Sequence, residues 1–539
     1  MINKTLKKSL VALTTATMVA ALAVAIPTAA RADGPTCSEV AAATKYSARN
    51  TQLCSGVDQF GAKYEIAMPK KFNGTLIVYS HGIRKNVNLP PLPVIAPKGE
   101  LIDYSPAIAP SNEVAIALLK QGFALAGSGV QVQGWNAAEQ SLANVILIDQ
   151  AIATFPKIDR VAAWGSSLGA LSTQIMAEQN PGMVEAVAPL CLADSALSEI
   201  TMAGDFLWGL KTFFDPSIKA VGYSAGQAGY VEMLGDLGKV LGVLGALQAA
   251  IKANPIAPAW PATSTAPATL KGIPVRSAIL LLGLISGIST QSKTYDASSG
   301  PKGPLETSFG LAISPALAVL ENGADAAILA VIANYDMEVR AGGIVFDNSK
   351  TNYAARLGDD GDVFAAGLSG KTATAGMLGY LSALNPAAPR VKADASAVER
   401  MKQIPEIAGT LTVPTITFTA TADHITPPGA TQYLIDQYAN AVASGNTAKG
   451  LMVNIWNKPA DEYTQFDSAG SPITPAAAPS GTVHCNFTTS QYLMIAKLLT
   501  DAAKSGKAPS SKVVKAAIKN DKNLFVDPNY RAPLLKYRQ

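Results

Sequence analysis

One serine of the chain stands in a short pattern that can turn a hydroxyl group into a nucleophile. The pentapeptide 165–169 reads Gly-Ser-Ser-Leu-Gly and lies between an apolar run and a segment of helical character. A strand that turns sharply into a helix at a serine forms a nucleophile elbow, in which the hydroxyl projects above a sheet. Glycine on either side allows the close passage of the chain that this turn needs. The pattern predicts Ser167 as the nucleophile, with Ser166 pointing away from any substrate.

The histidines and aspartates decide whether that serine can be activated. A serine hydroxyl reacts poorly until a base takes its proton and an acid orients the base. In one common arrangement the chain order is serine, acid, histidine. The sequence has only three histidines: His81 precedes the serine, His424 directly follows Asp423, and His484 lies far downstream. We therefore predict His484 as the base and Asp423 as the acid, with Asp194, which also follows a predicted strand, as the alternative acid.

Backbone N–H groups close to the serine could stabilise the oxyanion that forms when a hydroxyl attacks a carbonyl. Leu168 directly follows the serine, at the start of the predicted helix. Gly82 and Ile83 follow the predicted strand 75–80, and this strand end is where a second donor is expected. Such donors typically contribute about 10²–10³-fold each to the rate. We predict that Leu168 supplies one donor and the Gly82–Ile83 region the other.

Strands and helices must alternate to bring these residues together. The early strand is predicted at 62–68, and 86–110 is predicted as a long loop. Further strands are predicted at 75–80, 123–127, 160–166, 184–191, 413–420 and 451–456, the last of the chain, and helices at 111–121, 136–155, 167–179, 430–443 and 487–504. This alternation predicts an α/β fold with a mostly parallel sheet and helices on both faces. The candidate residues follow strands at the carboxyl edge, where ligands bind in such sheets.

The middle of the chain differs in character from the segments on either side. The runs 231–251, 277–289 and 310–334 are apolar at helical spacing and fall short of the roughly 20 consecutive apolar residues that a bilayer needs. We predict a large, mainly helical cap inserted into the sheet domain, with an independent second domain as the alternative. The predicted organisation is a signal peptide (1–32), the first part of the core (33–194), the cap (195–405), the second part of the core (406–505) and a basic tail that wraps over the surface (506–539).

The first residues have the features of a secretory signal peptide. Lysines precede an apolar run at 10–26, and Ala30-Arg31-Ala32 provides a small-residue cleavage site after Ala32. A membrane anchor is the alternative, but we expect export, extracellular or periplasmic, with no stable membrane span after cleavage. The leader holds four of the 43 basic residues and no acidic residue. After its removal, the basic residues that remain would equal the 39 acidic ones in number, so the mature chain would be close to neutral. No basic face for nucleic acid is indicated, and the oligomeric state stays open.

The four cysteines suit an exported protein. An even number in an oxidising compartment favours disulfides, here Cys37–Cys54 and Cys191–Cys485. The second bridge would hold the loop of His484 against the sheet beside the serine. A buried free thiol at Cys191 is the alternative. No Cys-x-x-Cys or histidine-rich cluster is present, so we expect no metal site and no cofactor.

Five short segments resemble secreted bacterial α/β-hydrolases, in particular large-capped serine hydrolases and esterases. They are Ser-His-Gly at 80–82, Gly-Ser-Ser-Leu-Gly at 165–169, Pro-Leu-Cys at 189–191, Thr-Ala-Asp at 421–423 and His-Cys at 484–485. The His-Cys pair is also similar to that of tannases and feruloyl esterases. In those enzymes the partner cysteine directly precedes the nucleophile, whereas Ser166 occupies that position here. The resemblance spans about 60–194 and 410–500 and implies an α/β-hydrolase fold.

These features together predict a secreted serine hydrolase that cleaves carboxylic esters, small or polymeric, through an acyl-enzyme. The cap is rich in Leu, Ile, Val and Ala, which predicts an apolar substrate pocket. A secreted serine peptidase or aminopeptidase is the alternative and would need an acidic pair to bind a peptide terminus. Glu321, Asp325, Asp336 and Glu338 are the candidates for such a pair. A non-catalytic binding protein on the same scaffold is a third hypothesis.

Overall fold

The computed structural model describes residues 34–40, 46, 51–92, 95–254, 257–298, 313–468 and 472–538. The predicted signal peptide lies outside these residues. Within them, ten strands form one sheet in the order β1-β2-β3-β5-β4-β6-β7-β8-β9-β12. Their bounds are Thr36–Glu39 (β1), Thr51–Val57 (β2), Lys63–Pro69 (β3), Thr75–Ser80 (β4), Ala124–Ser128 (β5), Arg160–Ser166 (β6), Ala186–Leu190 (β7), Thr415–Ala420 (β8), Met452–Asn457 (β9) and Leu524–Phe525 (β12).

The centre of the sheet is parallel, as the sequence predicted. Strands β5, β4, β6, β7, β8 and β9 pair in parallel, whereas β1, β2, β3 and β12 pair antiparallel with their neighbours. Strands β4 and β8 are buried along their whole length. Strands that are buried on both faces, and rich in β-branched residues as these are, occur where helices cover both faces of a parallel sheet.

Helices cover both faces of this sheet, and the alternation of side chains along β4 shows it. Ile77 packs in a cluster with residues of α2 (Asn112–Lys120) and α15 (Thr489–Ser505). Its neighbours Leu76 and Val78 point to the opposite face and pack with residues of α3 (Ala137–Thr154) and α4 (Leu168–Gln179). Successive side chains of a strand point to opposite faces, so one strand contributes to two cores. Helices α14 (Gly429–Ala443) and α16 (Ser511–Ile518) complete this part.

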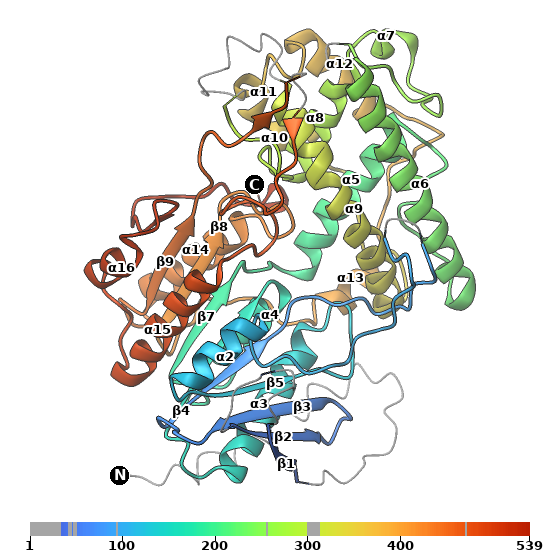
Figure 1. Cartoon of the computed structure of the whole chain (residues 1–539). Helices are drawn as coiled ribbons and strands as arrows, with labels where there is room; N and C mark the ends of the chain where they lie inside the picture. The colour runs from blue at the N-terminus through green and yellow to red at the C-terminus, as the bar shows by residue number, and fades with distance from the viewer. Residues whose placement is uncertain are drawn as a thin grey trace.

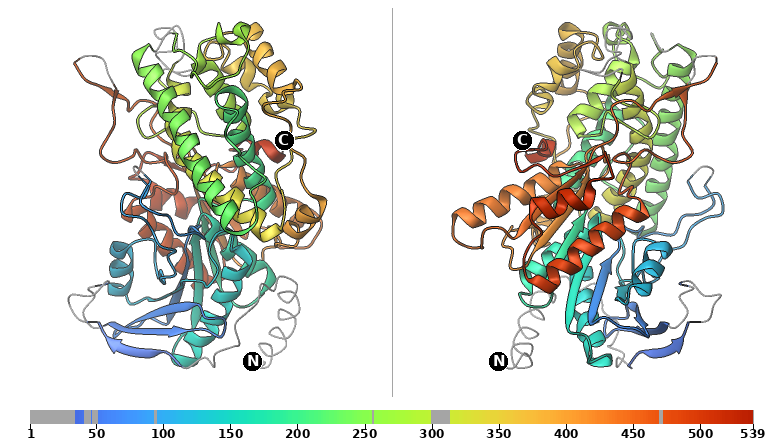
Figure 2. Two further views of the ribbon diagram at one scale, coloured as in Figure 1. Left: turned by 90° about the vertical axis from the view of Figure 1, so that its right-hand side faces the viewer. Right: turned by 60° about the vertical axis from the view of Figure 1, so that its left-hand side comes forward.

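A large helical insertion separates β7 from β8. Its helices are α5 (Ala196–Phe213), α6 (Gly226–Ala253), α7 (Ala268–Lys271), α8 (Val275–Ser286), α9 (Ser314–Ala341), α10 (Tyr353–Leu357), α11 (Asp360–Val363), α12 (Lys371–Ser382) and α13 (Ala395–Met401). They gather at one end of the molecule, with the sheet at the other (Figures 1 and 2). The insertion has a hydrophobic core of its own, formed by α5, α6, α8 and α9. The predicted helical cap is therefore present.

Two cap helices are longer than the sequence analysis predicted. Helices α6 and α9 have 28 residues each: α6 begins at Gly226, before the apolar run, and α9 continues past its run through Asp336 and Glu338. By length and composition alone, these two described helices could cross a membrane. In the folded chain, α9 packs against α5, α6 and α8, and 56% of its most apolar window is buried. Core helices of globular proteins have the same features, so length and composition do not indicate a span here.

The prediction that 451–456 is the last strand was wrong. Strand β9 is not the last: β12 adds to the sheet beside it, and β10 (Gln465–Phe466) and β11 (Pro472–Ile473) form a separate hairpin. Helix α16 buries Val514 and Ile518 against the core. Near the end of the chain, Arg538 binds the buried carboxylate of Asp194. Such short strands and single long-range contacts leave no periodic signal in the sequence.

Candidate active site

Ser167 lies at the turn between β6 and α4 in a conformation that residues with side chains rarely adopt. Its backbone angles are φ 60° and ψ −126°. Strain of this kind costs about 1–3 kcal/mol and is concentrated at functional sites. A Cβ on Gly165 would lie 2.2 Å from the carbonyl oxygen of Gly169, and one on Gly169 would lie 2.2 Å from that of Ser80. The glycines are thus required for the predicted elbow to form.

The elbow follows β6, the sixth strand in the order of the sheet, and the parallel centre of this sheet is preceded by the antiparallel strand β3. The cap enters after β7, and α4 follows the elbow directly. The chain has the α/β-hydrolase fold. In this fold the carboxyl ends of the central strands form one edge, at which the loops after β4, β6, β7 and β8 meet.

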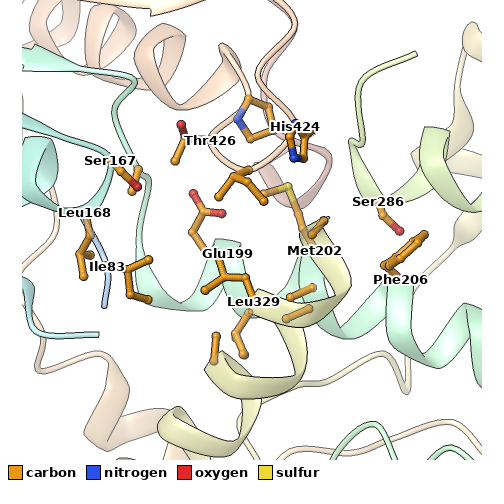
Figure 3. Close-up of a pocket in the computed structure, with 18 of the residues that line it drawn as sticks. Ile83, Ser167, Leu168, Glu199, Met202, Phe206, Ser286, Leu329, His424 and Thr426 are labelled. Atoms are coloured by element: carbon orange, nitrogen blue, oxygen red, sulfur yellow. The ribbon is translucent and has the colours of Figure 1, made fainter. Parts of the chain in front are cut away.

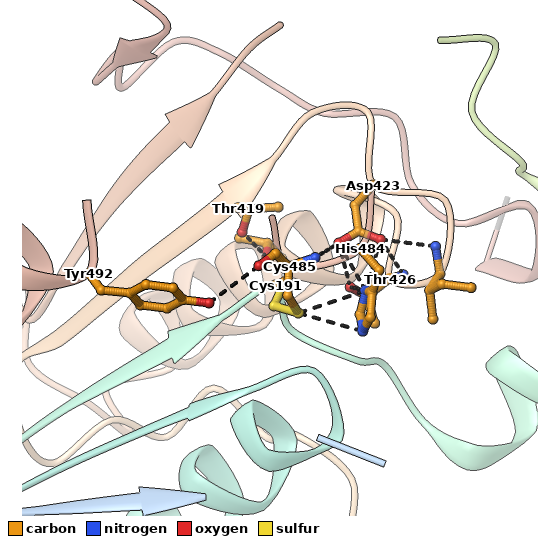
Figure 4. Close-up of a disulfide and its surroundings, with 9 residues drawn as sticks. Cys191, Thr419, Asp423, Thr426, His484, Cys485 and Tyr492 are labelled. Atoms are coloured by element: carbon orange, nitrogen blue, oxygen red, sulfur yellow. Dashed lines mark hydrogen bonds and ion pairs between the residues drawn. A yellow bond between two sulfur atoms is a disulfide. The ribbon is translucent and has the colours of Figure 1, made fainter. Parts of the chain in front are cut away.

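Asp423 and His484 form a hydrogen-bonded pair at this edge. The Nδ1–H of His484 donates to both carboxylate oxygens of Asp423, at 3.0 and 3.1 Å (Figure 4). Asp423 also accepts the backbone N–H groups of Ile425, Thr426 and Cys485. Burial of Asp423 favours its neutral form, but the charge and hydrogen bond of His484 and the backbone N–H groups lower its pKa below the usual value. The acid is therefore ionised beside the imidazole.

Both predicted disulfides are present in the structure. Cys37 and Cys54 are bonded across the paired strands β1 and β2, and Cys191 is bonded to Cys485 over a separation of 294 residues. Cys191 directly follows β7, and Cys485 is the residue after His484. The hydroxyl of Tyr492 donates to the carbonyl oxygen of Cys485 (Figure 4). The second disulfide thus ties the histidine loop to the sheet beside the elbow strand.

The serine and the histidine do not share a hydrogen bond in the described structure. The Nε2 atom of His484 instead lies 3.5 Å from the Sγ atom of Cys485. Catalytic hydrogen bonds are often long or poorly aligned in the absence of substrate and tighten when it binds. The structure therefore joins the predicted acid to the predicted base and leaves the contact between base and serine open.

The three residues predicted to surround an oxyanion lie next to Ser167. A Cβ on Gly82 would be 3.2 Å from the Cβ and 3.7 Å from the Oγ of Ser167. Ile83 and Leu168 line the same pocket as the serine. His81 directly follows β4. Its carbonyl oxygen accepts a hydrogen bond from the buried side chain of Gln140, which holds this end of the strand in place. Burial and the nearby arginine charge lower the pKa of His81 to about 4, so its ring is neutral.

A pocket opens beside the serine between the sheet edge and the cap (Figure 3). Its wall is mainly apolar. The apolar lining residues are Ile83, Trp135, Leu168, Ala193, Ile200, Met202, Ala203, Phe206, Ile288, Ala326, Leu329, Ala330, Ala333, Met337, Ile425 and Pro427. The polar ones are Ser167, Glu199, Ser286, His424 and Thr426. The cap helices α5 and α9 supply much of this lining.

The other candidate residues have different positions. Asp194, the alternative acid, accepts hydrogen bonds from Arg538 and Ser198, and its partners do not include His484. His424 lies in the pocket wall, with its Nδ1 atom buried and without a partner among the described residues. Ser166 is buried at the end of β6 and is absent from the described pocket lining.

The acidic residues considered for a peptide terminus serve other partners. Glu321 accepts hydrogen bonds from Ser292 and Thr294. Asp336 accepts from the backbone N–H of Trp135 and from Arg340, and Glu338 accepts the N–H groups of Gly222 and Tyr223. Asp325 lies 3.9 Å from Nε2 of His424 and is largely exposed. Among the described residues, none of the four lines the pocket.

Sequence reasoning missed Glu199, which is in the pocket wall. This residue belongs to the first turn of α5, five positions after Asp194. The only signal for it in the sequence was its position in the first turn of α5. Acidic residues are common at helix starts because of the helix dipole, so this signal is weak.

The side chains of Cys191, Asp423 and Cys485 place potential metal-ligand atoms within 4.8 Å of one another. The two sulfurs are bonded to each other, so they offer no thiolate for a metal ion.

Comparisons with known proteins give distant likenesses. No known family model and no curated protein matches the chain. Among solved structures, feruloyl esterase B from Aspergillus oryzae is 11% identical, with 90% of this chain and 89% of that chain covered and a TM-score of 0.34. The rice cell wall degrading esterase LipA from Xanthomonas oryzae is 10% identical, with 80% and 92% covered and a TM-score of 0.31.

A third likeness covers a much smaller share of the chain. The Pyrococcus horikoshii acylaminoacyl peptidase is 11% identical, with 28% of this chain covered and a TM-score of 0.19. The chain spans 31% of the length of that peptidase. The assignment of the fold rests on the strand order and the elbow described above.

Proposed function

We propose that the protein is an exported serine hydrolase that cleaves carboxylic esters through an acyl-enzyme. The observation that carries this proposal is the strained Ser167 at the mouth of an apolar pocket, on the same sheet edge as the Asp423–His484 pair. A serine, a histidine and a buried carboxylate in this chain order are the groups that acyl transfer requires.

In the proposed mechanism, the Oγ atom of Ser167 attacks the ester carbonyl and gives its proton to Nε2 of His484. Asp423 holds the Nδ1–H of the ring, which leaves Nε2 free as the acceptor, and its negative charge stabilises the imidazolium. The protonated His484 then donates to the leaving alcohol. Water, activated by the same histidine, cleaves the acyl-enzyme and restores the serine.

The negative charge that develops on the carbonyl oxygen needs hydrogen-bond donors close to Ser167. We assign this role to the backbone N–H of Leu168, which begins α4, and to an N–H of Gly82 or Ile83. The start of a helix carries unpaired N–H groups and a partial positive charge, both of which favour an anion. These residues need no cofactor for the reaction.

The apolar lining supports an ester with an apolar acyl or alcohol part, since burial of apolar surface drives its binding. Two disulfides support export, because such bonds persist in oxidising compartments. A peptidase is less well supported, because the candidate acidic residues bind other groups.

The test is a panel of p-nitrophenyl esters and peptidyl amides with the wild type, Ser167→Ala and Ser166→Ala. Ser166 is the matched control: it is buried at the end of β6 and does not belong to the described pocket lining, so loss of its hydroxyl should leave activity intact. We expect ester hydrolysis by the wild type and Ser166→Ala and none above background by Ser167→Ala. Amide cleavage without ester cleavage, or a preference for short polar esters, would contradict the proposal.

A further inference from the structure

One carboxyl group lies in the wall of the otherwise apolar pocket. Glu199 is the sole acidic residue in the described lining. Figure 3 shows its carboxyl group directed into the pocket, between Ser167 and Leu168 on one side and Met202 on the other. The proposed ester cleavage does not use it. A polar group in such a wall is costly unless something in the pocket forms a hydrogen bond with it.

The carboxyl group is held in this position by a chain of hydrogen bonds. Its Oε1 atom accepts the backbone N–H of Asp194 at 3.0 Å. The carboxylate of Asp194 is fixed in turn by Arg538, through contacts of 2.5 and 3.0 Å, and by the hydroxyl of Ser198 at 2.7 Å. Because the groups that hold Glu199 are themselves held by hydrogen bonds, its side chain should lose little conformational entropy when a ligand binds. Such a side chain is suited to recognition. The second oxygen of Glu199 has no described protein partner and is available to a ligand.

The surroundings determine the charge of this group. Burial raises the pKa of Glu199 to about 8, and the negative charges of Asp194 and Asp423 raise it further. The hydrogen bond from the N–H of Asp194 and the positive charge of Arg538 act in the opposite direction and are outweighed. Near neutral pH the group is mainly a carboxylic acid. One oxygen then accepts the N–H of Asp194, and the O–H is left to donate to an oxygen atom in the pocket.

We propose that Glu199 is a specificity-determining residue that binds an oxygen substituent, a hydroxyl or carbonyl group, on the part of the ester that occupies this pocket. This inference rests on the proposed ester hydrolysis and names its substrate class: oxygen-substituted esters in preference to plain alkyl esters. A plain alkyl chain would cover Glu199 and leave its hydrogen-bonding group unpaired, which disfavours that substrate. A neutral acid, with no second carboxyl group in the described lining, does not suit an ammonium group.

The test compares matched substrate pairs. One series varies the acyl part, with p-nitrophenyl hexanoate and its positional hydroxy and oxo derivatives. The other varies the alcohol part, with hexyl acetate, its hydroxyhexyl isomers and an aminohexyl analogue. The enzyme is tested as wild type, Glu199→Gln and Glu199→Leu. The amide of glutamine keeps an acceptor for the N–H of Asp194 and a donor for the ligand, whereas leucine keeps neither.

We expect the wild type to prefer an oxygen-substituted ester in at least one series, and Glu199→Leu to lose about 10- to 100-fold of that preference in kcat/KM. Glu199→Gln should retain most of it. A purely structural role would lower activity towards all substrates alike and leave the ratio unchanged.

The inference is overturned if the ratio is the same in wild type and Glu199→Leu in both series, or if the aminohexyl ester is the preferred substrate. Fluorophosphonate labelling of each variant checks that the serine remains reactive. If the wild type cleaves no ester, the proposed function itself fails. If it cleaves esters without this dependence, only the role of Glu199 fails.

Discussion

His484 donates its Nδ1–H to both carboxylate oxygens of Asp423, at 3.0 and 3.1 Å, although 61 residues separate the two along the chain. Asp423 is almost fully buried, and three backbone N–H groups hold its oxygens in place. The pair therefore has a fixed orientation before any substrate arrives. This fixed orientation is the basis of the first prediction.

Asp423→Asn should lower kcat by about 10⁴-fold, because the amide favours the wrong tautomer of the histidine while the geometry is kept. Hydrolysis of a p-nitrophenyl ester measures the effect, and circular dichroism checks the fold. Asp461→Asn is the control: Asp461 is exposed, and its ion-pair partner within the described segments is Lys458, so its loss should not change the rate. A rate for Asp423→Asn within tenfold of the wild type would show that another group orients His484.

The disulfide between Cys191 and Cys485 should affect catalysis, whereas that between Cys37 and Cys54 should not. Replacing Cys191 and Cys485 together by alanine frees the loop of His484, and small misplacements of a catalytic group can cost about 10²-fold in rate. Each double variant should also lose about 2–4 kcal/mol of stability. Measuring kcat beside thermal unfolding separates the two effects. Equal loss of kcat in both double variants would rule out a specific role for the bridge beside the histidine.

Gly165→Ala should prevent the elbow from forming. The new Cβ would meet the backbone oxygen of Gly169 at 2.2 Å, and backbone atoms cannot move aside cheaply. We expect loss of activity and a large loss of stability in thermal unfolding. Gly235→Ala in α6 is the control, since nothing lies within 4 Å of its Cβ, and alanine should stabilise the helix by about 1 kcal/mol. An active, stable Gly165→Ala protein would be incompatible with the described turn.

Glu199→Gln should change how stability depends on pH. In the unfolded chain the glutamate ionises near 4.5, whereas the folded chain keeps the proton up to about 8. Unfolding between these values releases a proton, so the stability from this group is full below pH 4.5 and is lost as pH rises to about 8. The facing charged groups are Asp194, Asp423 and Arg538, and the variant keeps all three.

Urea unfolding at several pH values measures the effect. Between pH 5 and 8 the free energy of unfolding of the wild type should fall by up to about 1.4 kcal/mol per pH unit because of this group. The Glu199→Gln variant should lack this contribution. Parallel curves for the two proteins would mean that Glu199 is ionised in the folded chain, and would remove the donor that the further inference requires.

Sequence reasoning found those parts of the fold and site that have local signals. The elbow has glycines at fixed spacing around Ser167, and the strands on either side are continuous apolar runs. His484 could be found because the chain has few histidines and the order of the residues limits the choice. Cys191 and Cys485 could be paired because the signal-peptide pattern led us to expect export, and disulfides are the expected state of cysteines in an oxidising compartment.

The residues that were missed depend on contacts between distant segments. Glu199 resembles any acidic residue at a helix start until the cap is folded over the serine. Arg538 stands in a basic tail, and only the fold shows that it binds Asp194. Strand β12 has two residues, too few for any periodicity to appear. Long-range contacts of this kind are determined by packing and not by local sequence.

The most direct test of the central claim is to identify the residue that reacts with a fluorophosphonate probe, by mass spectrometry of the labelled protein. We expect one adduct, on Ser167, that is absent from Ser167→Ala and retained in Ser166→Ala. An adduct on Ser166 or another residue, or unchanged labelling of Ser167→Ala, would contradict the assignment of the nucleophile.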